Sequence, residues 1–180
     1  MPRPLSVTLC VLMLAISLVA SAPGGRRDPL TEAETDQLRE QAQEPVARLR
    51  LYIKFAGIRM VALEEVPANA KADLKRGQKI HDLLEDFANL IDEIDDNIDN
   101  YSEHGSDMRK PLKELIDAES DWALRLRTMK DAIAKDPQAA KEARDYSFAL
   151  DSAIDSVNDS ADSTRKILEE QNASLKTKKK

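Results

Sequence analysis

Residues 80–103 read IHDLLEDFANLIDEIDDNIDNYSE, and the spacing of the apolar residues in this stretch decides the fold class. The apolar positions step alternately by four and three residues, at Ile80, Leu84, Phe87, Ile91, Ile94, Ile98 and Tyr101. This spacing places the apolar side chains on one face of a helix that packs lengthwise against other helices. The stretch therefore predicts a long α-helix with coiled-coil-like packing.

The acidic residues of the same stretch fall on the opposite face of the predicted helix. A calcium loop would need a glycine at its sixth position and a bidentate acid at its twelfth, but a count from Asp95 puts Asn100 and Ser106 there. The acids are therefore interpreted as a solvated face. The members of this acidic stripe are Glu85, Asp92, Asp96, Asp99 and Glu103. The residues expected to compensate their charge are Arg48, Arg50, Lys54 and Arg59.

Three further helices are expected around this one. A capping box of Thr31 and Glu34 opens the first, which has a kink or break at Pro45. Pro111 lies in the first turn of the third, where proline is favoured. The predicted fold is all-α, an antiparallel up-and-down four-helix bundle over residues 31–171. A three-helix arrangement with the segment before Pro45 detached is the alternative. The expected helices span 31–66, 69–103, 107–135 and 137–171.

The first residues have the layout of a secretory signal peptide, expected to cover residues 1–22. Arg3 precedes an apolar run at 5–20, and small residues follow it. The run is shorter than the roughly 20 residues that span a bilayer as a helix. Cleavage is expected near residues 20–24, which leaves 23–30 as a linker and no membrane span in the mature chain. The protein is therefore expected to be secreted or periplasmic.

The charge balance makes nucleic acid an unlikely partner. The chain has 33 Asp and Glu against 27 Lys and Arg, a net charge of −6, and the final KTKKK holds four of the positive charges. An acidic body repels phosphate, and the basic tail over 172–180 is interpreted as a solvated terminus. The one cysteine, Cys10, lies in the predicted signal peptide, so the mature chain depends on its core without disulfides.

The sequence contains no recognisable catalytic or cofactor motif. His81 and His104 form no metal-ligating pair at helical spacing, and neither a haem-attachment motif nor a glycine-rich phosphate loop occurs. The chain is therefore predicted to be no enzyme and to have no catalytic, cofactor or metal residues.

Two polar residues, Asn97 and Glu119, interrupt the predicted apolar stripes. A buried Asn commonly fixes helix register. Glu119 would bind a ligand or respond to pH if it were enclosed, or it would pair with Arg48 or Arg125. These two residues and the acidic stripe support the alternative function, a ligand- or metal-carrying helical bundle of the envelope space.

The segment ARLRLYIKFAGIRMVAL, residues 47–63, has two apolar faces, whereas a bundle helix needs one. The second face includes Leu51, Phe55 and Ile58, at nearly 180° from the first. The predicted interaction patch, for a second copy of the chain or another envelope protein, is Leu51, Phe55, Ile58, Arg48 and Arg59. Alternatively, residues 30–43 fold back and cover this face. The function that the sequence favours is protein–protein association or a structural role in the envelope.

Overall fold

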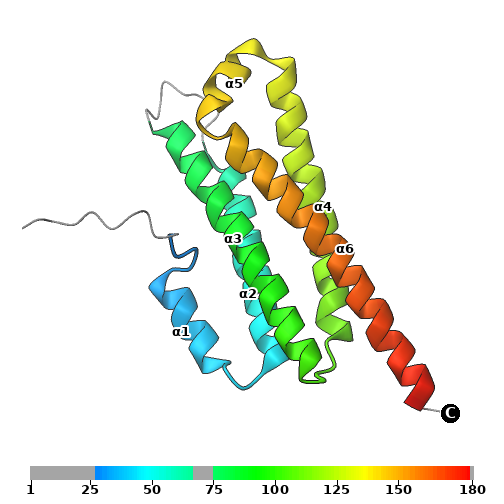
Figure 1. Cartoon of the computed structure of the whole chain (residues 1–180). Coiled ribbons are helices and arrows are strands. Elements are labelled where there is room, and N and C mark those ends of the chain that lie inside the picture. The colour runs from blue at the N-terminus through cyan, green and yellow to red at the C-terminus, as the bar shows by residue number, and fades with distance from the viewer. Residues whose placement is uncertain (1–26, 67–74, 179–180) are drawn as a thin grey trace, which may run out of the picture.

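The computed structural model describes residues 27–66 and 75–178, and within these ranges all regular structure is helical (Figure 1). The predicted all-α fold is confirmed over these residues. The predicted signal peptide lies outside them. The elements are α1 (Glu32–Glu40), α2 (Pro45–Glu64), α3 (Arg76–Glu103), α4 (Arg109–Lys135), α5 (Pro137–Glu142), a 3-10 turn η1 (Ala143–Asp145) and α6 (Ser147–Lys178).

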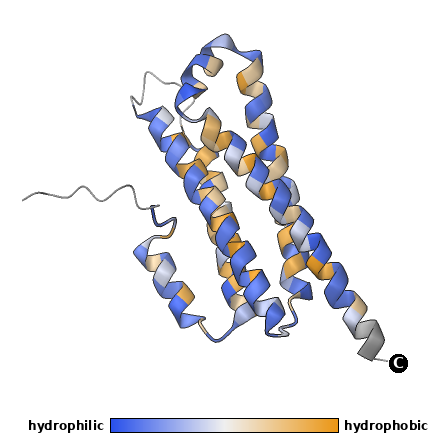
Figure 2. Ribbon diagram, in the orientation of Figure 1, coloured by the Kyte–Doolittle hydropathy of each residue, from blue (hydrophilic) through white to orange (hydrophobic). Residues whose placement is uncertain are grey.

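The four long helices lie side by side, and consecutive ones run in opposite directions (Figure 1). α2 packs against α3 and α4, and α6 packs against the same two helices. α3 and α4 therefore lie across the core from each other, although they follow one another along the chain. Hydrophobic residues concentrate on the inner sides of these helices (Figure 2).

The apolar seam predicted for α3 lies in this core. Its residues from Ile80 to Ile98 are buried, and Tyr101 is partly buried. Phe87 meets Trp122 of α4 edge to face, with 5.4 Å between ring centroids, a geometry that aromatic pairs prefer. This contact joins the two diagonal helices through the centre of the molecule.

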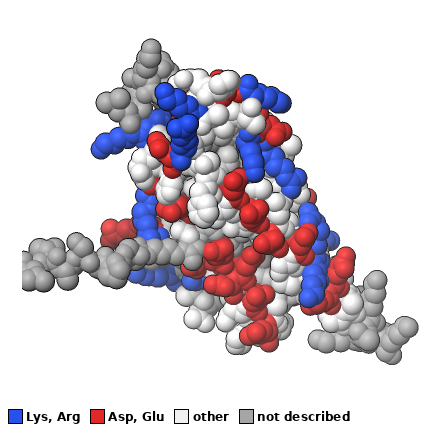
Figure 3. Space-filling view, turned by 45° about the horizontal axis from the view of Figure 1, so that its top comes forward, with Lys and Arg blue, Asp and Glu red and all other residues white. Residues whose placement is uncertain are grey.

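The acidic stripe of α3 is exposed along its whole length, so its interpretation as a solvated face is confirmed. Acidic side chains also gather on the face of the molecule shown in Figure 3. The expected compensation by Arg50 and Arg59 is wrong, because Arg50 bonds to Glu114 of α4 and Arg59 to Glu34 of α1. The acid with which each of these arginines pairs thus depends on where the arginine lies on α2, as well as on charge.

The first predicted helix is two helices. Thr31 and Glu34 form the expected capping box of α1, and Pro45 occupies the first turn of α2. Proline fits there because its missing N–H needs no partner in a first turn. The connecting residues turn the chain, and α1 packs back against α2. α1 is therefore not a detached segment.

The fourth predicted helix is also interrupted. Asp136 caps α5, and the chain passes through η1 before α6 begins. Ala143 and Tyr146 are both buried there, so the turn follows the packing of these two side chains. α6 then continues to Lys178, which makes most of the predicted tail over 172–180 helical.

Among the described residues, none of the helices combines the length and the apolar composition needed to cross a membrane.

Candidate functional site: the groove between α2 and α4

The structure divides the interaction patch predicted on α2. Phe55 is only 1% exposed and Arg59 is buried, whereas Leu51 and Arg48 are partly buried. Ile58 is 44% exposed. The predicted patch is therefore wrong as a continuous exposed surface, and Ile58 is its most exposed member.

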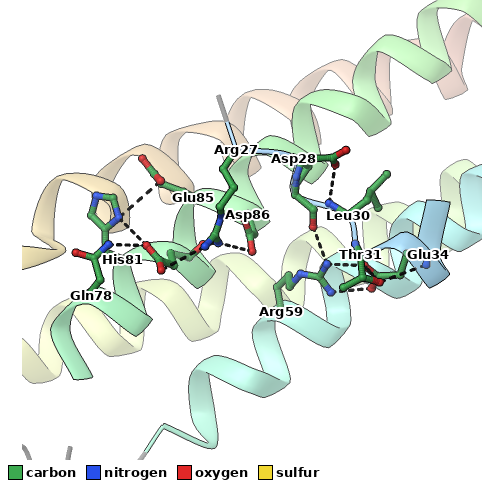
Figure 4. A network of polar contacts seen from close by, with 12 residues as sticks. Arg27, Asp28, Leu30, Thr31, Glu34, Arg59, Gln78, His81, Glu85 and Asp86 are labelled. Atoms are coloured by element: carbon green, nitrogen blue, oxygen red, sulfur yellow. Dashed lines mark hydrogen bonds and ion pairs between the residues drawn. The ribbon is translucent and has the colours of Figure 1, made fainter. Parts of the chain in front are cut away.

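The cause is α1, which is tied to α2 by two arginines of the predicted patch. Arg59 donates to both carboxylate oxygens of Glu34, at 2.7 and 2.6 Å (Figure 4). Arg48 donates to the carbonyl oxygen of Leu38 at 3.1 Å. Phe55 lies on the same face of α2, between these two arginines. The alternative in which residues 30–43 cover the second apolar face accounts for its burial.

An apolar surface remains on the side of α2 that faces α4. Ile58 and Val61 are 44% and 49% exposed, and they border a groove of about 490 Å³ between the two helices. Met60 and the buried Trp122 of α4 contribute to its lining. Exposed aliphatic side chains beside a buried aromatic ring are typical of interface surfaces.

Gly57 lines the same groove and lies in the middle of α2. A Cβ built at this position meets no atom within 4 Å. Glycine in a helix interior lowers helix stability by about 1 kcal/mol relative to alanine. No described neighbour of Gly57 lies so close that a side chain at this position would be excluded. A glycine of this kind allows another backbone to approach closely.

The rim of the groove carries charges of both signs. Lys54 lies on α2 and Glu65 directly follows its last residue, while Asp121 and Arg125 lie on α4. Arg125 pairs with Asp121 at 2.8 Å and with Glu64 at 3.1 Å. The groove therefore has an apolar centre and a polar edge of mixed charge.

Asn97 is a structural residue between α2 and α3. Its side-chain oxygen accepts from Tyr101 at 2.9 Å and from Arg48 at 3.4 Å, and its amide donates to the carbonyl of Glu93. Both of its polar atoms are thus occupied by partners within the chain, as a role in helix register requires.

Glu119 is fully buried, and its partners are neither Arg48 nor Arg125. Its Oε1 lies 2.9 Å from the hydroxyl oxygen of Ser160 and accepts from Thr164 at 3.0 Å, and its Oε2 has no partner among the described residues. Burial raises the pKa of this carboxyl to about 7. The sequence indicated the polar interruption at this position, but not the two hydroxyl partners.

A cluster of His81 with two carboxylates lies at the start of α3. The Nδ1 atom of His81 is 3.7 Å from carboxylate oxygens of both Asp82 and Glu85 (Figure 4). These three residues could together hold a metal ion. Asp82, however, already accepts from Gln78 at 2.6 Å and pairs with Arg27 at 3.2 Å. A guanidinium thus already supplies positive charge to this cluster.

Comparisons with protein-family models, with curated proteins and with solved structures find no match for this chain.

Proposed function

We propose that the protein is an exported, non-enzymatic antiparallel four-helix bundle that acts by association with a second copy of itself through the groove between α2 and α4. Export to the periplasm or the extracellular space is supported by the signal-peptide layout of residues 1–22. The observation that carries the association is the exposed pair Ile58 and Val61 beside Gly57, whose missing side chain leaves open space.

The mixed charge of the rim favours a second copy as the partner. In a two-fold dimer the same surface meets itself, so each charged residue must find an opposite charge on an identical patch. Lys54 and Arg125 supply the positive groups and Glu65 and Asp121 the negative ones. A partner of one uniform charge would be repelled by half of this rim.

A non-enzymatic role is supported by the way the polar clusters are used. Glu34 and Arg59 bind each other across α1 and α2, and Asn97 bonds along α3 and to α2. These groups stabilise contacts between elements.

Solution molar mass, measured by light scattering over a range of concentrations, tests the association. The wild-type protein is expected to approach twice its monomer mass as concentration rises. Ile58→Glu and Val61→Glu should each weaken the dimer at least about tenfold, because each buries an uncompensated carboxylate in an apolar interface.

Phe148→Glu is the matched control, since Phe148 is 85% exposed and lies on α6 rather than in the groove. This variant should dimerise like the wild type, and helix content by circular dichroism should be equal in all variants. A wild-type monomer at every concentration would overturn self-association. A dimer lost in Phe148→Glu but retained in Ile58→Glu would place the interface elsewhere.

A further inference from the structure

A second feature, independent of the groove, joins α3, α4 and α6 inside the molecule. The hydroxyl oxygen of Ser160 on α6 lies 2.7 Å from Oδ1 of Asp95 on α3 and 2.9 Å from Oε1 of Glu119 on α4. Thr164, one turn further along α6, donates to the same Glu119 oxygen at 3.0 Å. Two carboxyl groups therefore share one hydroxyl.

The number of protons available for these contacts determines the protonation state of the two carboxyl groups. A serine hydroxyl has one proton and can donate one hydrogen bond. If Asp95 and Glu119 were both ionised, one carboxylate would face the serine oxygen at hydrogen-bond distance with no proton between them. A buried anion would also leave Oε2 of Glu119 without a donor, and such a group is costly to bury. The contacts are satisfied only when the pair holds one additional proton.

Burial indicates which residue holds that proton. Glu119 is fully buried, whereas Asp95 is partly exposed and can have its charge solvated. With Glu119 neutral, its O–H donates to Ser160 and Ser160 donates to Asp95, so that every hydroxyl proton has an acceptor. The unpartnered Oε2 then belongs to a neutral acid, which is less costly to bury than an anion.

We propose that Glu119, Ser160 and Asp95 form a proton-binding site in which Glu119 is held as the neutral acid and is linked through Ser160 to an ionised Asp95. This site is separate from the groove, which lies between α2 and α4.

The charges around the site support this assignment. Burial raises the pKa of Glu119 to about 7 and that of Asp95 to about 6. Arg165 of α6 is a nearby positive group that lowers the pKa of Glu119, and Asp95 raises it. Further carboxylates on α3 raise the pKa of Asp95, namely Asp92, Asp99 and Asp96. The carboxylates of α3 thus favour retention of a proton by the pair.

A titration of side-chain carboxyl carbons by NMR in the wild-type protein tests the proposal directly, with Glu119→Gln used to assign the signal. The midpoint for Glu119 is expected near pH 7. A midpoint at or below about 4.5, the ordinary value for a glutamate, would overturn it. So would a proton found on Asp95 while Glu119 titrates normally.

Ser160→Ala tests the direction of the hydrogen bonds. If neutral Glu119 donates to Ser160, loss of that acceptor lowers the Glu119 midpoint. If Ser160 instead donates to ionised Glu119, the midpoint rises, and the proposed arrangement is wrong.

Stability gives a second readout. One proton held only by the folded state makes the folding equilibrium constant fall about tenfold per pH unit between about pH 4.5 and pH 7. Glu119→Gln should remove most of this slope. Asp117→Asn, which removes an exposed carboxylate from the same helix, should retain it. Equal slopes in the wild type and Glu119→Gln would overturn the proposal.

Discussion

At the scale of single residues, the contact between Arg59 and Glu34 is the most enclosed ion pair in the described part of the chain. Their side chains are only 8% and 9% exposed, and Arg59 also donates to the carbonyl of Pro29 at 2.6 Å. Hydrogen bonds from Arg59 and Thr31 outweigh the effect of burial and lower the pKa of Glu34. Each of the two buried charges is therefore compensated by the other.

Removal of one partner should be far more damaging than loss of an exposed pair. Arg59→Met leaves Glu34 unpaired in a buried position, and we expect the free energy of unfolding to fall by about 3–5 kcal/mol in urea denaturation. Lifting of α1 into water would reduce this loss and would appear as faster hydrogen exchange in α1.

Arg50→Met is the control for that comparison. It breaks a bidentate contact with Glu114, but both side chains are substantially exposed. The expected loss is within about 1 kcal/mol. Equal losses in the two variants would show that the Arg59 contact is no more protected from water than the Arg50 contact.

At the scale of elements, glycines in α2 and α3 differ in what surrounds them. Gly57 faces open space, whereas a Cβ at Gly77 would lie 2.8 Å from Oδ2 and 3.2 Å from Cβ of Asp145. Gly57→Ala should therefore raise the free energy of unfolding of the monomer by about 0.5–1 kcal/mol. Gly77→Ala should gain less or lose stability, because the residues around Asp145 must move. Thermal unfolding of both variants gives this comparison, and an equal gain at both sites would contradict it.

Gly57→Leu extends the same comparison to the proposed dimer. The monomer has room for the larger side chain, so the variant should fold, while its side chain fills the groove and blocks the second copy. Folded monomers of Gly57→Leu at concentrations where the wild type is dimeric would separate an effect on association from one on folding.

Local signals in the sequence lie close to several helix starts, although Pro45 was expected to kink or break a helix. The Thr31 capping box, Pro45 and Pro111 each lie at or near the start of a helix, since their hydrogen-bonding and backbone preferences act within one turn. The break between α5 and α6 had no such signal. Ala143 and Tyr146 are buried at this break, which therefore lies against the assembled core.

The candidate sites show the same division. The spacing of residues 47–63 indicated two apolar faces on α2, but periodicity does not reveal what covers a face. α1 covers Phe55, while Ile58 stays exposed together with Val61, which was not in the predicted patch. Glu119 was noticed as a polar interruption, whereas Ser160 and Asp95 became its neighbours only through the packing of α6 against α3 and α4.

At the scale of the whole molecule, the buried carboxyl groups make the stability of the fold depend on pH in opposite directions. Glu34 stabilises the fold in its ionised form, whereas the pair of Glu119 and Asp95, whose pKa values are both raised, favours the state that holds one added proton. The first contribution is fully present above about pH 4.5 and is lost as pH falls through the lowered pKa of Glu34. The second is fully present below about pH 4 and is lost as pH rises through about 6 to 7.

These two dependences predict a stability maximum near about pH 5, with a decline on each side. Urea unfolding midpoints at about pH 3.5, 5 and 8, at constant ionic strength, would measure it. Glu119→Gln should flatten the alkaline side, because the folded state no longer loses a bound proton there. The double variant Glu34→Gln with Arg59→Met should flatten the acid side, because no buried carboxylate must then be protonated. A wild-type stability that rises steadily from pH 5 to pH 8 would show that the Glu119 and Asp95 pair is already ionised in the folded protein.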